Sequence, residues 1–207
     1  AAGIDIVTGA HVTALVATPD GRIRGMVVTR PDGSGERIGC AALVLACNGY
    51  GGNRALVAEY IPALKDALYF GHPGNQGDAV LWGQALGAEL RHMTGHQGHG
   101  SVAHPHGILI SWAVVMEGGF QINAAGARFW NEASGYSEAA LAVLGQPGGI
   151  AYDIFDARIA GIARQFEDFR RAEESGAVLQ AESSDELAER LNISPQVIRT
   201  TLESVAG

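Results

Sequence analysis

The densest group of residues able to do chemistry is a run of five histidines between residues 92 and 106. His92 and His96 have the i, i+4 spacing of a helical metal-binding pair, and His99 follows at His-x-x-His spacing. However, no Asp or Glu occurs between residues 90 and 116, and interspersed glycines oppose a helix. The pattern favours a loop over a metal site, either solvated or with His96 or His99 facing a substrate. A metal-binding or non-catalytic domain that uses this loop remains the alternative.

Two glycine-rich segments could hold a ligand against bare main chain. The first is Cys47-Asn48-Gly49-Tyr50-Gly51-Gly52-Asn53, and the second is Gly74-Asn75-Gln76-Gly77-Asp78. Glycine lets main-chain N–H groups approach a flat or phosphorylated ligand, and the start of a helix suits electron-rich ligand atoms. An ordinary tight turn and a helix cap at Asp78 explain the same residues. The two segments together are more informative than either alone.

A further glycine pattern, Gly98-His99-Gly100-Ser101-Val102-Ala103, fits G-x-G-x-x-A. No strand is expected before it and no clear helix after it, so it fails the context of a dinucleotide-binding fingerprint. We therefore assign it no cofactor role.

The segment from Gly126 to Tyr136 combines charged and aromatic side chains. Arg128 and Glu132 are spaced to form an internal ion pair at a corner between a strand and a loop. Tyr136 follows just beyond, where its phenol could face a ligand site or simply be exposed. Both interpretations of Tyr136 stay open on these residues alone.

These candidates are positioned by a mixture of strands and helices. Segments 12–17 and 25–29 predict a hairpin, 37–38 a further strand, 4–7 a short strand and 41–46 a strand buried on both faces. Helices are expected at 54–60 and 78–90, and extended chain at 108–115 and 119–123. The remainder is expected to be largely helical, with Ser184 as an N-cap and Pro195 beginning the last helix.

Composition limits the classes of function. The 207 residues are 47% hydrophobic, enough for a core, and the net charge of −8 without a basic cluster argues against nucleic-acid or anionic-membrane binding. The longest apolar run, 108–116, is too short to span a membrane. Cys40 and Cys47 lie in one apolar stretch, which favours buried thiols in a reducing compartment, and we expect a cytoplasmic protein.

Several of these segments, taken in order, resemble the flavoprotein family of fumarate reductases, succinate dehydrogenase flavoprotein subunits, 3-ketosteroid dehydrogenases and tricarballylate dehydrogenase. Residues 43–53, Leu-Val-Leu-Ala-Cys-Asn-Gly-Tyr-Gly-Gly-Asn, are similar to the family's V-L-A-T-G-G-F-G-G-N, and residues 74–78 to its G-N-T-G-D-G. Residues 122–132 are close to its V-N-x-x-G-x-R-F-x-N-E. The resemblance also includes the hairpin at 20–25 and the segment 185–188, so it covers most of the chain.

The resemblance implies an FAD-dependent enzyme of α+β fold. Residues 1–98 are then part of a two-segment FAD-binding domain, built of the hairpin, the buried strand and helices, without its N-terminal Rossmann unit. Residues 99–207 are an α+β capping domain, truncated at its C-terminus. The residues expected near FAD are Val12, Ala46, Cys47, Gly49, Asn75, Gly77 and Asp78.

The chemistry implied is hydride transfer between flavin and a carbon–carbon bond next to a carbonyl or carboxylate. Fumarate reductases carry a proton-donating Arg shortly after R-F-x-N-E, where this sequence has Tyr136. The steroid dehydrogenases resemble R-F-x-N-E-x-x-x-Y, which this sequence matches, so we expect a member closer to the steroid or tricarballylate dehydrogenases. Tyr136, with His99 or His96, is then expected to face a small-molecule substrate, either a steroid-like ketone or a carboxylic acid.

The chain begins Ala1-Ala2-Gly3 without an initiator Met, and its length is short for this family. We expect an internal fragment whose partners include the missing segments of its parent chain. An inactive fragment that folds without FAD is a further alternative.

Overall fold

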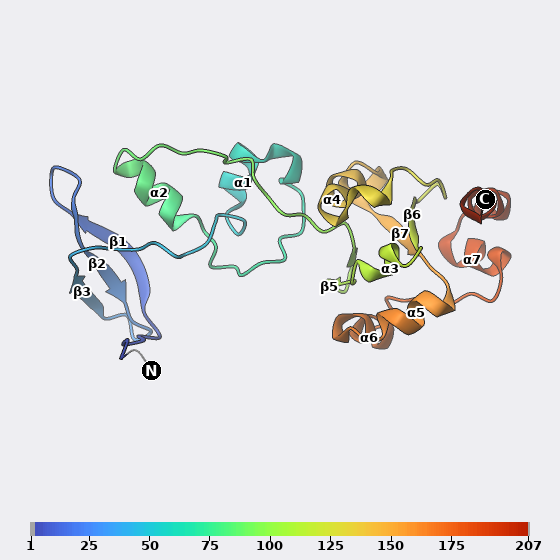
Figure 1. The fold of residues 1–207 in the computed structure, drawn as a ribbon, viewed down its shortest axis with the longest axis horizontal. Helices are drawn as coiled ribbons and strands as arrows, with labels where there is room; N and C mark the ends of the chain where they lie inside the picture. The colour runs from blue at the N-terminus through green and yellow to red at the C-terminus, as the bar shows by residue number, and fades with distance from the viewer. Residues whose placement is uncertain (1–2, 207) are drawn as a thin grey trace. The chain divides into compact units, whose positions relative to one another are not determined.

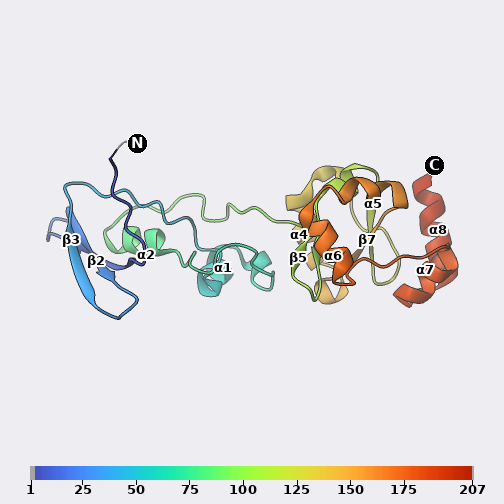
Figure 2. The same ribbon diagram turned by 90° about the horizontal axis from the view of Figure 1, so that it is seen from below.

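The computed structural model of the protein describes residues 3–206. Contacts divide the chain into two compact units, Ala1–Gly95 and His96–Gly207, whereas the sequence-based boundary follows residue 98. Helices and strands are mixed along the chain, which confirms the expected α+β class (Figures 1 and 2). Ala1, Ala2 and Gly207, on which the expectations about the chain ends rest, lie outside the described residues.

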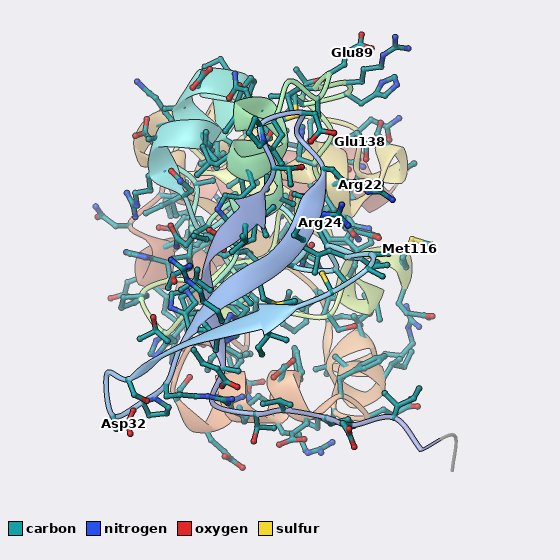
Figure 3. All side chains as sticks on the ribbon, turned by 90° about the vertical axis from the view of Figure 1, so that its left-hand side faces the viewer. Arg22, Arg24, Asp32, Glu89, Met116 and Glu138 are labelled. Atoms are coloured by element: carbon teal, nitrogen blue, oxygen red, sulfur yellow. The ribbon has the colours of Figure 1, made fainter. Side chains whose placement is uncertain are left out.

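The first unit begins with an antiparallel three-stranded sheet in the order β1-β2-β3. Its strands are β1 (His11–Ala17), β2 (Ile23–Thr29) and β3 (Gly35–Gly39). The expected hairpin is confirmed, and Gly21 adopts the positive φ of +82° that its turn requires. In the second turn, Asp32 Oδ1 accepts a hydrogen bond from Ser34 N at 2.9 Å, which fixes the tip labelled by Asp32 in Figure 3.

Two apolar segments that the sequence predicts as strands are not strands. Residues 4–7 and 41–46 are irregular, and Ile6 and Val44 are 87% and 86% exposed. A buried strand needs hydrogen-bonded neighbours, and no backbone hydrogen bond joins either segment to another part of residues 3–206. The expectation of buried thiols is also wrong for Cys47, which is exposed, while Cys40 is half-buried.

Two helices follow the sheet in the first unit. α1 (Arg54–Tyr60) has the expected bounds because Asn53 Oδ1 accepts hydrogen bonds from the first-turn amides and Pro62 lies just beyond its end. α2 (Asp78–Ala85) is shorter than the predicted 78–90. Gly87 at φ +81° ends it in a Schellman motif, in which Ala88 N donates to Gly83 O at 2.9 Å.

The second unit contains two small antiparallel sheets. They pair β4 (Val102–Ala103) with β5 (Ile108–Leu109), and β6 (Phe120–Asn123) with β7 (Ala151–Ile154). β6 confirms the extended segment predicted at 119–123. The extended prediction for 108–115 is wrong at its end, where α3 (Ala113–Met116) forms, and β7 lies in a region expected to be helical.

Five further helices cover these sheets: α4 (Tyr136–Leu144), α5 (Ala157–Ala163), α6 (Glu167–Glu174), α7 (Ser184–Leu191) and α8 (Pro195–Ala206). Two short 3-10 turns, Glu132–Ser134 and Pro147–Gly149, flank α4. Pro195 begins α8 as expected, but the cap of α7 is Ser183 rather than Ser184. Ser183 Oγ accepts a hydrogen bond from Glu186 N at 3.2 Å.

Buried hydrophobic clusters form in the second unit. One centres on Phe169 of α6, a second joins Ile122 of β6 to Ile198 of α8, and a third joins Trp112 to Ala139 of α4. The third cluster contains Trp112, whose indole lies edge-on to His99. Among residues 3–206, no helix is long and apolar enough to cross a membrane.

Candidate functional site

The two glycine-rich segments of the first unit lie against each other. Gly52 N donates a hydrogen bond to Asn75 O at 2.9 Å, and Asn53 Nδ2 donates to Gln76 O at 2.9 Å. Gln76 Nε2 returns a hydrogen bond to Gly52 O at 3.2 Å. We call residues 48–53 and 74–78 the glycine junction, because segments over twenty residues apart form one surface there.

Glycine is required in this junction for packing. A Cβ on Gly52 would lie 3.0 Å from Asn75 O, and one on Gly77 would lie 2.5 Å from Leu56 Cδ1. Gly77 also has a φ of +86°, which disfavours other residues. Gly49 differs, because a Cβ there would meet nothing within 4 Å. The space beside Gly49 is therefore open to a ligand, and its N–H donates locally to Asn48 Oδ1 at 2.9 Å.

Of the other residues predicted to contact the cofactor, most lie in or next to this junction, and Val12 does not. Asp78 lies in the first turn of α2, and Asn75 Nδ2 donates to Tyr69 Oη at 2.6 Å. Ala46 and Cys47 are exposed on the irregular segment that leads into the junction. Val12 lies apart on β1, opposite Val28. Between β1 and α2 is an apolar cavity of about 220 Å³, lined by Ala14, Leu15, Ala17, Trp82, Ala85 and Leu86.

In the second unit, His99 and Tyr136 meet. Their ring centroids are 5.4 Å apart, and the indole of Trp112 lies edge-on to His99 at 6.0 Å. Tyr136 is the first residue of α4, and its Oη accepts a hydrogen bond from Gln97 Nε2 at 2.8 Å. The structure thus brings together two of the three predicted substrate-facing residues. His96 is exposed at the start of this unit.

Close packing of the 98–100 loop on α4 explains this meeting. Gly98 N donates to Ser137 Oγ at 3.0 Å, and Gly100 N donates to Tyr136 O at 3.0 Å. A Cβ on Gly98 would lie 2.8 Å from Ser137 O, and one on Gly100 would overlap the Cβ of Ala139. The G-x-G-x-x-A pattern here serves loop-to-helix packing.

The hydrogen bonding of His99 defines its tautomer. The ring is half-buried, and its Nδ1 accepts a hydrogen bond from Ser101 N at 3.2 Å. Burial lowers the pKa of His99 below its ordinary value, because the charged imidazolium loses solvation. A neutral imidazole whose Nδ1 is an acceptor carries its hydrogen on Nε2. His99 can therefore donate from Nε2 at neutral pH.

A polar network of two buried residues, Ser101 and Gln121, and two half-buried residues, Trp130 and Asp153, is hydrogen-bonded to this loop. Asp153 accepts hydrogen bonds from Ser101 Oγ and from Gln121 Nε2, the latter at 2.8 Å. Gln121 Nε2 also donates to Gly100 O at 2.9 Å, and Trp130 Nε1 donates to Gln121 Oε1 at 2.9 Å. We call Ser101, Gln121, Trp130 and Asp153 the polar network. Burial raises the pKa of Asp153, while the hydrogen bonds from Ser101 and Gln121 oppose that rise.

Sequence reasoning missed this network. Asp153 lies in a region expected to be helical, and it faces Gln121 only because β6 pairs with β7 in that register. Trp112 was also missed, since it lies in an apolar run with no polar pattern. Trp112 is 9% exposed, and its indole Nε1–H is buried without a hydrogen-bond partner in the described structure.

The predicted ion pair of Arg128 and Glu132 is present. Arg128 Nε lies 3.0 Å from both carboxylate oxygens, and Glu132, 4% exposed, also accepts from Gln121 N at 2.9 Å. Burial tends to raise the pKa of Glu132, but the hydrogen bonds from Arg128 and Gln121 outweigh it, so the pKa lies below its ordinary value. Arg128 is engaged in fixing this corner.

The remaining histidines of the loop do not join His99. His92, His104 and His106 are exposed, whereas His99 is half-buried. Among residues 3–206, no group of three or more His, Cys, Asp or Glu side chains is arranged to hold a metal ion. The metal-binding alternative therefore gains no support from the side-chain arrangement.

Comparisons with known proteins agree on one family. A family model described as an FAD binding domain matches residues 1–205. The chain is 33% identical to "Probable fumarate reductase Ifc3" of Shewanella frigidimarina over 83% of this chain and 29% of that protein. Among solved structures, the open conformation of a flavocytochrome c3 fumarate reductase matches 94% of this chain and 34% of its own, at a TM-score of 0.74 and 29% identity.

A second solved structure extends the likeness of fold. The 3-ketosteroid-Δ4-(5α)-dehydrogenase from Rhodococcus jostii RHA1, in complex with 4-androstene-3,17-dione, matches at a TM-score of 0.60 and 21% identity. The match covers 94% of this chain and 38% of that one. The chain thus spans only about a third of the length of these relatives, as the expectation of a fragment-like length requires.

Proposed function

Because the chain belongs to the FAD binding domain family, we propose that it is part of an FAD-dependent oxidoreductase of the CH–CH class. The reaction is hydride transfer at a carbon–carbon bond next to a carbonyl or carboxylate. The observation that carries the proposal is the exposed main chain of Ala46 and Cys47, which makes no backbone hydrogen bond to another described segment, together with the open space beside Gly49 in the glycine junction. A flat dinucleotide needs such a surface, since side chains would hold it away from backbone N–H groups.

The residues of the first unit fit FAD. Gly49 has open space around it, and residues 41–47 make no backbone hydrogen bond to another described segment, so their amides can serve a ligand or added strands. We assign Ala46, Cys47, Gly49, Asn75, Gly77 and Asp78 to the cofactor, with Val12 toward its adenine side. When bound, FAD accepts or supplies the hydride. Residues 1–98 then form a partial FAD-binding domain, and 99–207 a capping domain.

The second unit supplies the groups that act on the substrate and its proton. Tyr136 Oη accepts from Gln97, which leaves its own hydrogen free to be given to a substrate carbon or its oxygen. His99 Nε2–H can hold the activating oxygen of the substrate in place. His96 is a second candidate for the substrate face. In the dehydrogenating direction, the phenolate form of Tyr136, left after its own proton has passed to solvent, would accept the proton from the carbon next to the carbonyl while the hydride leaves the adjacent carbon.

The substrate class follows from this chemistry. A ketone or a carboxylic acid both activate the adjacent carbon, so a small molecule of either class suits the proposed reaction. Cys47 is an exposed free thiol, which a reducing compartment tolerates, and we place the protein in the cytoplasm. The remaining segments of the full-length protein would complete the cofactor site, and this chain alone would be inactive.

The cofactor assignment is tested by the visible spectrum of the full-length purified protein. We expect flavin absorbance bands with about one FAD per chain, and loss of most of that FAD in Gly52→Ala, because the added Cβ forces the two junction segments apart. Gly35→Ala is the control, since a Cβ there meets nothing within 4 Å and its φ is ordinary. Full-length protein that remains colourless after addition of FAD would sink the proposal.

The proton-transfer role is tested by Tyr136→Phe. We expect the rate of flavin bleaching by substrate to fall by roughly 10²–10⁴-fold, with substrate affinity nearly unchanged, because only the transferable proton is removed. Tyr152→Phe is the control, since Tyr152 packs against a different cluster. A Tyr136→Phe variant within about threefold of the parent rate would exclude this residue as the acid or base.

A further inference from the structure

Gly100 and Ser101 follow the histidine of the candidate site, and their main chain is hydrogen-bonded to other elements. Gly100 N donates to Tyr136 O of α4 at 3.0 Å, and Gly100 O accepts from Gln121 Nε2 of β6 at 2.9 Å. Ser101 O accepts a hydrogen bond from Ile110 N at 3.0 Å. These bonds fix the path of the main chain at this point of the loop.

The N–H of Ser101 is the group that holds the histidine ring. It donates to His99 Nδ1 at 3.2 Å, and among the hydrogen bonds of the described residues it is the one that engages this imidazole. Ser101 is buried, so its N–H needs a protein acceptor in place of water. The direction of the Ser101 N–H therefore determines which nitrogen of His99 is the acceptor and which carries the hydrogen.

The side chain of Ser101 is in turn held by Asp153 of β7. Ser101 Oγ donates to Asp153 Oδ2, and Asp153 Oδ1 accepts from Gln121 Nε2 at 2.8 Å. One carboxyl group thus holds Ser101 directly and also fixes the amide that binds the preceding carbonyl, Gly100 O. Ser101 and Gln121 are 5% and 1% exposed, so water is poorly placed to replace this carboxyl group.

The amide of Gln121 has a single orientation that satisfies all its neighbours. An indole N–H can only donate, so the atom of Gln121 that lies 2.9 Å from Trp130 Nε1 is the amide oxygen. The amide nitrogen then has two hydrogens to donate, and its acceptors are Gly100 O and Asp153 Oδ1. Loss of the Asp153 carboxyl group would leave donors of Gln121 and Ser101 unmatched and free this arrangement to change.

We propose that Asp153 is a positioning residue for His99: through Ser101 it directs the Ser101 N–H at His99 Nδ1 and so keeps the imidazole hydrogen on Nε2. This inference rests on the proposed function for the use made of that hydrogen, which there holds the activating oxygen of the substrate. A donor fixed before the substrate arrives needs no reorganisation during the reaction. Asp153 acts only through the hydrogen bonds of the polar network.

The test is the tautomer of His99 in the full-length protein, labelled with ¹⁵N at histidine and measured by NMR, with the resonances assigned by His99→Gln. We expect the Nε2–H tautomer in the parent. Asp153→Ala is expected to lower the ratio of the Nε2–H to the Nδ1–H tautomer about fivefold, as loss of one net hydrogen bond would. Asp153→Asn should stay within about twofold of the parent, because its amide can accept from Gln121 and donate to Ser101 Oγ.

The matched control is Asp156→Ala in the same unit. Asp156 Oδ1 caps α5 by accepting from Ile159 N at 2.8 Å, and none of the described hydrogen bonds joins it to the polar network. Its loss destabilises the unit through a helix cap, so the His99 tautomer should not change. Ser101→Ala breaks the bond to Asp153 from its other end and should lower the tautomer ratio as Asp153→Ala does. Thermal melting shows which variants are folded, and Ser101→Ala decides the outcome if Asp153→Ala is not.

Three outcomes overturn the inference: an Nδ1–H tautomer in the parent, a ratio within about twofold of the parent in the folded Asp153→Ala or Ser101→Ala variant, or an equal change in Asp156→Ala. None of these measurements requires bound FAD or substrate. A protein that stays colourless with FAD, or a Tyr136→Phe variant of unchanged rate, is instead a failure of the proposed function, so the two failures are distinguishable.

Discussion

The two units of the chain are built on different principles. In the second unit, three buried hydrophobic clusters and the polar network interlock side chains from most of its elements. In the first unit, the buried hydrophobic side chains among the described residues are Val28, Leu56 and Ile61. Several others are more than half exposed, among them Ile4, Ile6, Val44 and Phe70. The first unit is joined mainly by backbone contacts at its sheet and at the glycine junction.

The second unit is therefore built for stability, whereas the first unit is built for contact with a ligand. Apolar burial and satisfied buried polar groups are the main sources of folding free energy, and the second unit has both. The first unit leaves main-chain groups and apolar side chains exposed, so we expect it to be less stable when isolated. The same exposed groups are suited to contact a cofactor and other segments of the full-length protein. Fragments and variants that disturb one unit and spare the other test this contrast.

The strongest test is to produce the units separately. We expect residues 96–207 to unfold cooperatively with a free energy of about 5 kcal/mol, the lower end for natural domains, and residues 1–95 to show no cooperative transition. The measurement is thermal and urea unfolding followed by circular dichroism and by tryptophan fluorescence. A cooperative transition of the first unit alone, as large as that of the second, would remove the contrast.

The Glu132 carboxylate gives the next largest effect. Glu132→Gln removes the bidentate pairing of Arg128 in a buried setting, and we expect a loss of about 2–3 kcal/mol at pH 7. The matched control in the first unit is Glu36→Gln, whose exposed pair with Arg30 is expected to contribute under about 1 kcal/mol. Urea unfolding of the whole chain and of residues 96–207 compares the two changes.

The same pair predicts a pH dependence. The pKa of Glu132 is lower in the folded state than its ordinary value of 4.5, so its contribution to stability is complete above about pH 4.5. That contribution is lost as the pH falls through the lower, folded-state pKa. The difference in unfolding free energy between parent and Glu132→Gln should be constant from pH 6 to 8 and shrink in acid. A constant difference down to pH 3 would contradict this assignment.

The sequence predicts the parts of these units that depend on residues close together in the chain, and it misses those that depend on residues far apart in the chain. The hairpin, α1 and the Arg128–Glu132 pair were predictable because their signals are local: turn residues, an Asn cap and an i, i+4 spacing. The segment 41–46 was not, because an apolar run indicates a strand only where neighbouring strands exist to pair with it.

The residues of the candidate site also divide into those that the sequence predicts and those that it does not. Tyr136 and His99 were found by residue type and by resemblance, and the structure places them together. The network behind them was invisible, since Gln121 and Asp153 meet only through the register of β6 and β7, and β7 has four residues, too few to show a period. The unpaired Trp112 could not be found from sequence, because an absent acceptor is a property of the packed structure.

A smaller effect is expected at Asp153. Asp153→Ala removes the acceptor for Ser101 Oγ and one of two acceptors for Gln121 Nε2, and we expect a loss of about 1–2 kcal/mol. Asp153→Asn keeps an oxygen for Gln121, and its amide can donate to the serine hydroxyl, so it should retain most of the stability. Burial holds the pKa of Asp153 above its ordinary value of 3.8 in the folded state, so the parent loses stability as the pH rises from that value through the folded-state pKa, and the Asn variant should gain on the parent over that range. Equal stabilities of the Ala and Asn variants would show that the hydrogen bonds contribute nothing.

The smallest expected effect compares two indole nitrogens in the same cluster. Trp130→Phe leaves Gln121 Oε1 without its donor, so we expect a loss of about 1 kcal/mol in residues 96–207. Trp112→Phe removes a buried donor that has no acceptor, and this gain offsets part of the cost of the cavity left by the smaller ring, so we expect a loss of under about 1 kcal/mol. Urea unfolding of the two variants under identical conditions gives both values. A larger loss for Trp112→Phe than for Trp130→Phe would mean that removing the indole N–H of Trp112 brings no gain in stability, as expected if that group already had an acceptor in the ligand-free protein. The second unit would then hold its polar groups fully satisfied, and its structural network would be separate from any ligand it binds.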